Sequence, residues 1–312
     1  MGKIAFVFPG QGSQYIGMGK ELFDNIEVCR NIFNIADEEL NFKLSSLCFE
    51  GLEEELSITE NTQPAILTTS IAALMALKER GISCDVTAGL SLGEYSALVC
   101  SGAMDFKDAV GLVKKRGRFM QEAVPMGIGT MAAILGLDSS AVEEACSEAR
   151  TSGIVEIANL NCPGQIVIAG EIAAVELACE RAKVKGAKRA MLLSVSAPFH
   201  TSMLKPAAQK LETELENINL ADITIPVMTN VTGSYISSKD DIKNNLKLQV
   251  MSSVLWETTI RNMIKDGVDT FVEIGPGKVL SGFVKKIDRK LMVVNVEDLE
   301  SLDKAVELLK KK

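Results

Sequence analysis

A glycine-flanked serine stands between a short apolar run and a helical stretch, an arrangement that few folds accommodate. The run from about Asp85 to Ala88 predicts a buried strand, Gly89-Leu90-Ser91-Leu92-Gly93 follows it, and a helix is predicted from there to about Ser101. A sharp turn that joins a strand to a helix in this way is typical of a nucleophile elbow, which holds a serine hydroxyl at the carboxyl end of a sheet. The alternative is a glycine-rich helix start with an exposed serine, because short motifs often match by chance.

Short apolar runs alternate with helical patterns on both sides of this turn. Ile4–Phe8 is an apolar run that ends at Pro9-Gly10, helical patterns follow around residues 18–35 and 64–80, and another helix is predicted from Asp105 to about Val124. Buried strands that alternate with helices predict an α/β fold with a mainly parallel sheet. We expect this large domain to be α/β-hydrolase-like, with the serine at the carboxyl edge of the sheet.

The stretch over residues 126–196 has a different order of elements. Strands are predicted at Thr130–Leu137, Val155–Asn159, Gln165–Ala169 and Ala190–Val195, helices at 139–150 and Ile172–Lys185, and a turn at Asn161-Cys-Pro-Gly164. The order βαββαβ is that of a ferredoxin-like unit. We therefore expect a small inserted subdomain at 126–196 and a large domain made of 1–125 and 197–312. On return to the large domain, the chain is predicted to form a strand, a helix and a strand at Ile225–Asn230, Ser252–Asp266 and Thr270–Ile274.

Composition excludes several classes of function. The chain has 312 residues, a formal net charge of −8, a single histidine and seven cysteines without CxxC pairs. An acidic chain without a strongly basic domain disfavours nucleic-acid binding, and one histidine without paired thiols disfavours a metal site. No apolar run is long enough for a membrane span, and we expect no signal peptide. We expect a cytoplasmic protein whose cysteines are small buried hydrophobes, among them Cys29, Cys48, Cys100, Cys146 and Cys179.

A serine nucleophile needs a base near neutral pH, and the single histidine limits the choice. A histidine base for Ser91 can only be His200, which stands in Ser196-Ala-Pro-Phe-His200 at the end of the expected small subdomain. Clefts often form at such domain junctions. The alternative is an ordinary core or surface histidine, since the sequence alone does not bring Ser91 and His200 together.

The loop after the first predicted strand is rich in glycine. Phe8-Pro-Gly-Gln-Gly-Ser-Gln14 lacks the third glycine of a dinucleotide loop, because Tyr15 stands there, and no GK[ST] is present. By analogy with α/β hydrolases, such a loop contributes an amide to an oxyanion hole. Gln11 is the candidate.

Arg116 is predicted to lie on the apolar face of the helix 105–124. Ala109, Val113, Met120 and Ala123 share that face with it, because they recur at helical spacing. A charge on an apolar face is costly unless it is paired. Two interpretations are open. In the first, the arginine is structural, and it either pairs with an Asp or Glu or extends to solvent at the helix edge. In the second, its guanidinium lies in a cleft and binds a substrate carboxylate. Three neighbouring cations are predicted to point elsewhere, namely Lys114, Lys115 and Arg118.

Five motifs in this order resemble the malonyl-CoA:acyl-carrier-protein transacylase family of type II fatty-acid synthesis. The resemblance extends from the start to about residue 290 and rests on Phe8–Gln14, Gly89-Leu-Ser-Leu-Gly-Glu-Tyr-Ser-Ala97, Asn161-Cys-Pro-Gly-Gln165, Ala197-Pro-Phe-His200 and Glu273-Ile-Gly-Pro-Gly-Lys-Val-Leu280. It implies a ping-pong transfer of malonyl from CoA to the phosphopantetheine thiol of acyl carrier protein, without a permanently bound cofactor. Malonyl-CoA and the acidic carrier protein are the implied partners.

The resemblance also implies roles for individual residues. Ser91 is the implied nucleophile with His200 as its base, and Arg116 pairs with the malonyl carboxylate. The implied oxyanion hole consists of the amides of Gln11 and Leu92. The implied remaining site residues are Gln249, whose backbone carbonyl orients the histidine, Gln63 and Asn159 in the cleft, and Phe199, which matches the malonyl-selective pattern. The chain departs from the family at Leu90, where many members have histidine, and at Ser253, where proline is common.

Two other classes of function remain open from the residues alone. A serine hydrolase would use the same dyad with water as acceptor, but it has no need for a buried arginine. A non-catalytic carrier-binding subunit would not need serine, histidine and arginine together. Two basic runs are either solvated helix faces or surfaces that steer an acidic carrier protein: Lys183, Lys185, Lys188 and Arg189, and Lys285, Lys286, Arg289 and Lys290.

Overall fold

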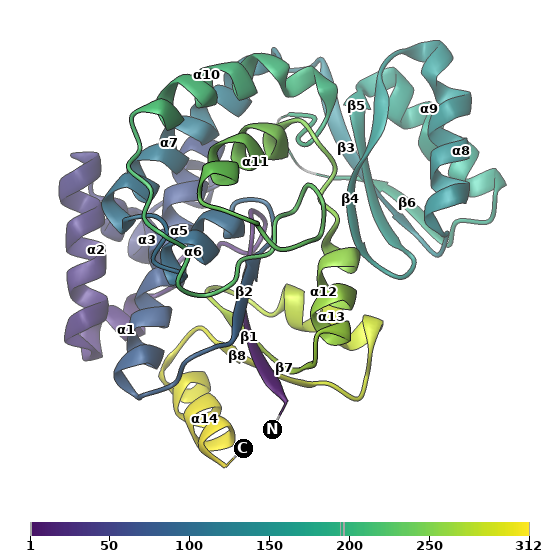
Figure 1. Ribbon diagram of the computed structural model, residues 1–312. Coiled ribbons are helices and arrows are strands. Elements are labelled where there is room, and N and C mark those ends of the chain that lie inside the picture. Colours follow the sequence, from purple (N-terminus) through teal and green to yellow (C-terminus); the bar gives the residue numbers. More distant parts are fainter. Residues whose placement is uncertain (1, 194, 196, 312) are drawn as a thin grey trace.

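A parallel sheet of four strands forms the centre of the protein (Figure 1). The computed structural model describes residues 2–193, 195 and 197–311. The strand order is β2-β1-β7-β8, with β1 at Lys3–Phe8, β2 at Val86–Gly89, β7 at Val268–Ile274 and β8 at Met292–Val296. Phe8 pairs with Gly89 and Val7 with Glu273, so the carboxyl ends of β1, β2 and β7 meet at one edge. The predicted α/β class with a parallel sheet is confirmed.

Helices cover both faces of this sheet, which explains the unbroken apolar run of β1. Phe6 and Phe8 belong to the core on one face, and Ala5 and Val7 belong to the core on the other. A parallel strand that is buried on both faces shows a continuous hydrophobic run of this kind. The helices of the first core include α5 (Thr59–Glu79), α6 (Gly93–Cys100) and α7 (Phe106–Ala123), and those of the second are α12 (Trp256–Lys265) and α13 (Val279–Ile287).

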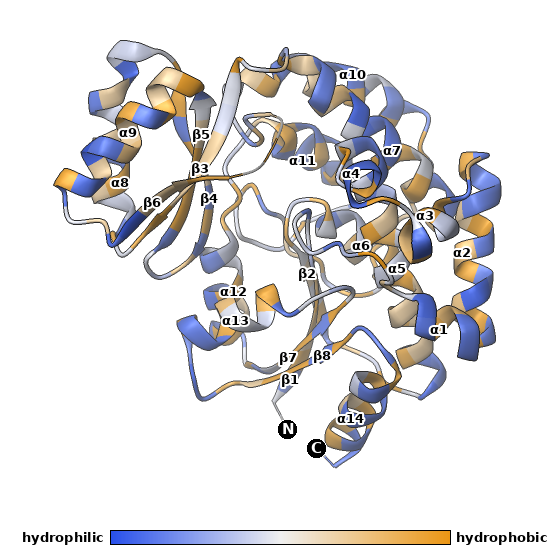
Figure 2. Cartoon of the chain, turned by 180° about the vertical axis from the view of Figure 1, so that it is seen from behind, coloured by the Kyte–Doolittle hydropathy of each residue, from blue (hydrophilic) through white to orange (hydrophobic). Residues whose placement is uncertain are grey.

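The outer helices complete the first core and expose a polar side. Figure 2 shows alternating hydrophobic and hydrophilic stripes along α2 and α14, as expected of helices with one buried face. The N- and C-termini lie near each other at the same end of the molecule in Figures 1 and 2. These outer helices are α1 (Lys20–Asn25), α2 (Glu27–Leu40), α3 (Leu44–Glu50), α4 (Glu53–Leu56), α10 (Lys205–Glu216), α11 (Asp240–Val250) and α14 (Leu299–Lys310).

A second sheet lies to one side, between α7 and α10 in the chain. Its four strands are antiparallel in the order β4-β5-β3-β6, and its two helices cover one face (Figure 1). Ala132 and Ile134 of β3 pack under these helices, whereas Met131, directly before them, faces the other way and belongs to the core of the large sheet. The elements are β3 (Gly129–Leu135), α8 (Ser139–Ala149), β4 (Val155–Cys162), β5 (Gln165–Glu171), α9 (Ile172–Val184) and β6 (Arg189–Leu192). Short 3₁₀ turns lie at Arg150–Ser152 and Ser202–Leu204.

Two predictions for the segment after residue 197 were inaccurate: one strand does not form, and one helix is shorter than predicted. Ile225–Asn230 does not form a strand, since Val227 and Met228 make only isolated bridges, to Thr87 and Tyr235. Pro226 has no amide hydrogen to extend a ladder. The helix predicted at Ser252–Asp266 begins only at Trp256, because Val254 bridges to Asn159 of β4 instead.

Smaller differences concern the second sheet. β4 continues to Cys162, so Asn161 and Cys162 lie in a strand and not in the predicted turn. The strand predicted at Ala190–Val195 is observed at Arg189–Leu192, and its residue 194 lies outside the described residues. The five cysteines predicted to be buried are buried, which are Cys29, Cys48, Cys100, Cys146 and Cys179.

Candidate active site

Ser91 occupies a strained turn between β2 and α6. Its φ is 53°, in the left-handed region that costs a residue other than glycine about 1–3 kcal/mol. The glycines on either side are required by close backbone approach. A Cβ on Gly89 would lie 1.9 Å from the carbonyl carbon of Gly93, and one on Gly93 would lie 2.2 Å from the carbonyl oxygen of Phe8. The tight turn presents Ser91 at the carboxyl edge of the parallel sheet.

The structure brings Ser91 and His200 together from positions 109 residues apart. Ser91 Oγ lies 2.7 Å from His200 Nε2, and His200 Nδ1 lies 2.9 Å from the backbone oxygen of Gln249. A carbonyl oxygen only accepts, so Nδ1 carries the proton and donates it to Gln249. The Nε2 lone pair is therefore free to accept the Ser91 hydroxyl, as a general base requires.

His200 stays neutral at neutral pH. Burial, and after it the charge of Arg116, lower the pKa of His200 from 6.5 to about 4, while the hydrogen bond to the Gln249 carbonyl opposes this shift. A neutral imidazole can take a proton from a serine hydroxyl, whereas an imidazolium cannot. The environment therefore keeps the ring in the form that a base needs.

Arg116 is buried on α7, as its spacing predicted, and it reaches the serine. Its Nη1 donates to Gln63 Oε1 at 2.8 Å, and its Nη2 donates to Gln249 Oε1 at 2.9 Å and to Ser91 Oγ at 3.2 Å. The guanidinium also lies over the ring of Tyr95, 5.4 Å from its centroid. Within the described residues, no carboxylate comes within 4 Å to form an ion pair with it, and its Nε has no hydrogen-bond partner.

The neighbouring cations of α7 point away from this site. Lys115 and Arg118 are exposed and Lys114 is half-buried, while Arg116 is only 1% exposed. Lys115 pairs with Glu214 and Arg118 lies near Glu122. Arg116 thus makes no direct ion pair with a structural carboxylate among the described residues, although the buried Glu94 acts on its charge from a longer distance.

Gln11 and Leu92 lie beside Ser91 on two adjacent loops. Because β1 and β2 are parallel neighbours, the loop after β1 packs against the serine turn, and a Cβ on Gly10 would lie 2.5 Å from the carbonyl oxygen of Leu90. Both residues line the same cavity as Ser91. No described group accepts a hydrogen bond from either backbone amide. Both amides are thus available to an oxygen anion above Ser91.

A cavity of about 580 Å³ opens above the serine, between the two sheets. Gln63 of α5, Asn159 of β4 and Phe199 line it, as the family resemblance implied. Asn161 lines it as well, and its Oδ1 has no hydrogen-bond partner among the described residues. Asn161 stood in a motif of the sequence analysis, but it was assigned to a turn and not to the cleft.

A buried network around the serine was missed by sequence reasoning, and it consists of Asn230, Glu94 and the side chain of Gln249. Asn230 Oδ1 accepts the Ser91 amide at 2.6 Å, and Asn230 Nδ2 donates to the oxygen of Gly89 at 2.7 Å. Glu94 Oε2 accepts hydrogen bonds from the amide of Asn230 and from the side chain of Gln249. Glu94 stands within the serine motif, yet no local signal points to partners more than 130 residues away.

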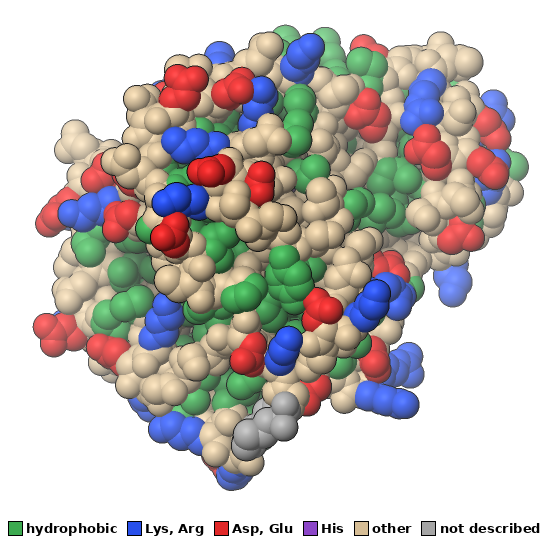
Figure 3. All heavy atoms as spheres, viewed as in Figure 1, with side chains coloured by type: hydrophobic (Ala, Val, Ile, Leu, Met, Phe, Trp, Pro, Cys, Tyr) green, Lys and Arg blue, Asp and Glu red, His purple; other side chains and the backbone are tan. Residues whose placement is uncertain are grey.

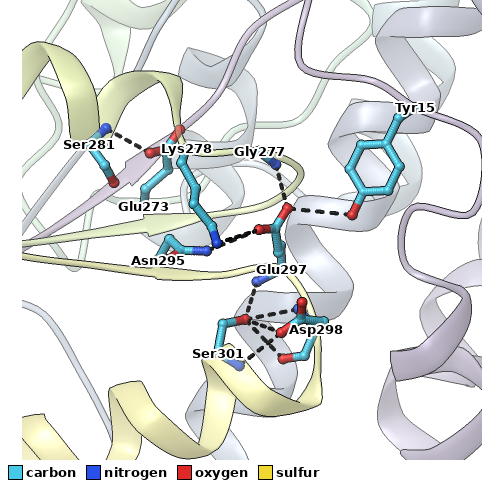
Figure 4. A network of polar contacts seen from close by, with 9 residues as sticks. All are labelled: Tyr15, Glu273, Gly277, Lys278, Ser281, Asn295, Glu297, Asp298 and Ser301. Carbon is cyan, nitrogen blue, oxygen red and sulfur yellow. Dashed lines mark hydrogen bonds and ion pairs between the residues drawn. The ribbon is translucent and has the colours of Figure 1, made fainter.

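Glu297, directly after β8, joins two loops that border the cavity (Figure 4). Its Oε2 accepts hydrogen bonds from the amide of Gly277 at 2.9 Å and from the hydroxyl of Tyr15 at 3.4 Å, and its Oε1 pairs with Lys278 at 3.3 Å. Tyr15 follows the loop that carries Gln11, and Lys278 precedes α13, whose first turns line the cavity. Glu297 therefore ties the loop after β1 to α13.

The two basic runs differ in their relation to the cavity. Lys185 pairs with Glu144 and Glu148 of α8, which neutralise it. Lys286 belongs to α13, the helix whose start lines the cavity, and its amine donates to Gln165 of the second sheet at 2.8 Å. On the face shown in Figure 3, acidic and basic side chains are interspersed, and the buried histidine is not visible.

No group of three or more His, Cys, Asp or Glu side chains in the described part of the chain could hold a metal ion. Among the described helices, none is long and apolar enough to cross a membrane.

A serine beside a neutral histidine, two free amides and a buried arginine make up a site suited to acyl transfer through a serine ester. The family model described as "Acyl transferase domain" matches residues 5–303. The chain is 55% identical to a malonyl CoA-acyl carrier protein transacylase of Bacillus subtilis, over 99% of this chain and 98% of the relative. It is 45% identical to the protein of the same name from Haemophilus influenzae, over 99% of this chain and all of the relative.

Solved structures of proteins with the same description superpose closely on this chain. The structure of a malonyl CoA-acyl carrier protein transacylase from Clostridium perfringens superposes with a TM-score of 0.96 at 52% identity, over 99% of this chain and 98% of the other. A malonyl-transacylase in complex with a type II polyketide acyl-carrier protein superposes with a TM-score of 0.96 at 44% identity, over 98% of this chain and 99% of the other. The chain belongs to the acyl transferase family and, within it, to the malonyl CoA-acyl carrier protein transacylases.

Proposed function

We propose that the protein transfers a malonyl group from malonyl-CoA to the phosphopantetheine thiol of acyl carrier protein, for fatty-acid synthesis, through an ester on Ser91. The observation that carries this proposal is the buried guanidinium of Arg116, 3.2 Å from Ser91 Oγ and without an ion-pair partner in the described part of the chain. A free carboxylate on the acyl group supplies that partner, in bidentate geometry. The names of the relatives support malonyl-CoA as the donor and acyl carrier protein as the acceptor.

The first half-reaction loads the serine. His200 Nε2 takes the proton from Ser91 Oγ, which attacks the thioester carbon of malonyl-CoA. The amides of Gln11 and Leu92 stabilise the oxygen anion that forms. The carbon–sulfur bond then breaks, and the CoA sulfur takes the proton from His200 as it leaves. The product of this step is malonyl-Ser91 with its free carboxylate on Arg116.

The second half-reaction unloads the serine by the reverse order of proton transfers. The phosphopantetheine thiol gives its proton to His200, and its sulfur attacks the ester carbon of malonyl-Ser91. A new carbon–sulfur bond forms, the carbon–oxygen bond breaks, and Ser91 Oγ recovers the proton from His200. Neither step needs a metal or a resident cofactor, so malonyl-CoA and the carrier protein are substrates only.

The remaining predicted residues take supporting roles. The Gln249 carbonyl orients His200 in place of a carboxylate, and the Gln63 side chain holds Arg116. Asn159 contacts the substrate from β4, and Phe199 narrows the cavity beside His200 in favour of malonyl over larger acyl groups. These roles follow from the contacts of each side chain and from the resemblance to the family.

The finer architecture and the location belong to the same proposal. We assign an α/β-hydrolase-like catalytic domain to residues 1–125 and 197–312 and a ferredoxin-like subdomain to 126–196. The strand order β4-β5-β3-β6 with two helices on one face supports the second assignment. A cytoplasmic location fits an enzyme that uses CoA thioesters.

The decisive experiment weighs the intact protein after incubation with malonyl-CoA or acetyl-CoA, with and without holo carrier protein. We expect a malonyl adduct on the wild-type chain that disappears when holo carrier protein is added and reappears on the carrier. Ser91→Ala should give no adduct. Adduct formation by Ser91→Ala in unchanged yield would refute the serine assignment. Release of free malonate in place of malonyl-carrier would instead indicate a hydrolase.

A further inference from the structure

Glu94 is a fully buried carboxylate directly behind the serine turn. It lies in the first turn of α6, and its side chain is 0% exposed. Its Oε2 accepts hydrogen bonds from Gln249 Nε2 at 2.8 Å and from the backbone amide of Asn230 at 3.0 Å, while Oε1 accepts none from the described residues. The proton transfers described above do not use this group. A buried carboxylate is costly, so its contacts need an explanation.

The first contact fixes the orientation of the Gln249 side chain. Gln249 Nε2 donates to two oxygens, those of Glu94 and of the Ser91 backbone, the latter at 3.0 Å. Because the two contacted oxygens act as acceptors, the amide turns its Oε1 in the opposite direction, where Arg116 Nη2 donates to it at 2.9 Å. The backbone oxygen of the same residue accepts from His200. Gln249 thus contacts the arginine and Glu94 through its side chain and the base through its backbone.

The second contact fixes the serine turn. Glu94 accepts the amide of Asn230, whose side chain bridges Ser91 N and the oxygen of Gly89. This bridge joins Gly89, two residues before the nucleophile, to Ser91 itself, whose φ is positive. A single oxygen of Glu94 therefore connects with the nucleophile, the base and the arginine through one intermediate residue on each side.

We propose that Glu94 is a positioning residue for acyl transfer, whose Oε2 aligns Arg116 through the Gln249 amide and Ser91 through Asn230. The inference rests on the proposed function, because the alignment of Arg116 matters only for an acyl group with a free carboxylate. The network requires at position 94 an oxygen that accepts two hydrogen bonds, as Oε2 does. A donor there would turn the Gln249 amide and present its NH₂ group to the guanidinium.

Two variants, Glu94→Gln and Glu94→Met, distinguish the effect of the hydrogen-bond acceptor from the effect of side-chain size. In Glu94→Gln the amide oxygen takes the place of Oε2 and keeps both hydrogen bonds, while the NH₂ group occupies the place of the partnerless Oε1. Glu94→Met has a similar length and no acceptor. Glu273 is the matched control, because it is equally buried and accepts the amides of Leu280 and Ser281 at the start of α13.

The measurements are the rates of adduct formation from malonyl-CoA and from acetyl-CoA, by rapid quench and intact mass, together with the melting temperature. We expect Glu94→Met to slow malonyl loading about 100-fold and to lower the malonyl-to-acetyl preference at least about tenfold, since the loss of hydrogen bonds to charged groups has effects of this size. Glu94→Gln should restore both rates to within about threefold. Glu273→Met should lower the melting temperature but keep the preference.

Several results would overturn the proposal. Equal slowing of both acyl donors by Glu94→Met would refute the alignment of Arg116. A Glu94→Gln variant as slow as Glu94→Met would assign the effect to charge and refute the role of Oε2 as an acceptor. If Glu94→Met does not fold, Gln249→Met replaces it in the test, because this variant removes the amide between Glu94 and Arg116 and leaves Glu94 unchanged. An unchanged preference in Gln249→Met then refutes the alignment of Arg116. A wild-type protein without a malonyl adduct would instead refute the proposed function, and this inference with it.

Discussion

Replacement of Arg116 by alanine removes the positive charge that lies 3.2 Å from Ser91 Oγ and leaves the nucleophile and base in place. In the wild type, the guanidinium is buried, held by two glutamine oxygens, and free to exchange them for a substrate carboxylate. Truncation of one partner of a buried, hydrogen-bonded charge pair costs about 2–5 kcal/mol. At about 1.4 kcal/mol for each factor of ten, malonyl loading should fall by roughly two to three orders of magnitude.

Acetyl-CoA provides the internal reference for this variant. An acetyl group has no carboxylate, so its loading should change little, and the malonyl-to-acetyl preference should fall by the same roughly two to three orders of magnitude. The assay is kcat/KM for both donors with holo carrier protein as acceptor. Arg118→Ala is the matched control, because Arg118 lies on the same helix but is exposed, and its preference should equal that of the wild type. An Arg116→Ala enzyme that keeps the wild-type preference would show that the arginine is structural and that the acyl group is selected elsewhere.

Three further perturbations test the turn, the base and the surface. His200→Gln should remove a pH dependence of stability: the pKa of His200 is lowered from 6.5 to about 4, so wild-type stability is full above pH 6.5 and falls toward pH 4. The wild type should therefore lose about 3 kcal/mol more than His200→Gln between these pH values in urea unfolding. Gly89→Ala should destabilise by at least about 3 kcal/mol, because its Cβ would meet the backbone of the next turn, whereas Gly111→Ala, with open space around it, should not. Charge reversal at the α13 run should slow transfer to carrier protein at low salt but not loading from malonyl-CoA, and an unchanged transfer rate would exclude steering by Lys285, Lys286, Arg289 and Lys290.

Local patterns in the sequence predicted the parts of the fold that local forces determine. The apolar run at Ile4–Phe8 and the turn around Ser91 were placed correctly, because burial on both faces and a forced backbone angle leave clear signatures. Arg116 was placed on a buried face because helical spacing is regular. The strand predicted at Ile225–Asn230 failed, since apolar residues there fill the core without a ladder around Pro226.

The missing part of the site depends on contacts between distant segments. Nothing near Asn230 indicates that its side chain receives the amide of Ser91, 139 residues earlier. The side chain of Gln249 was also missed, although its backbone oxygen was expected near His200 from the family resemblance. Such polar contacts depend on how the helices and loops meet, and a single sequence carries no pattern for them.

The uncharged partner of His200 has a consequence for the lifetime of the loaded enzyme. A carboxylate in the place of the Gln249 carbonyl would stabilise the imidazolium and make the ring a stronger base. With a pKa of about 4, the ring accepts a proton far more readily from a thiol, whose pKa is about 8.5, than from water, whose pKa is far higher. Water is therefore activated poorly, and in the proposed mechanism we expect the malonyl ester to persist until a thiol enters the cavity. The acidity of the incoming group thus favours transfer to a thiol over hydrolysis by water.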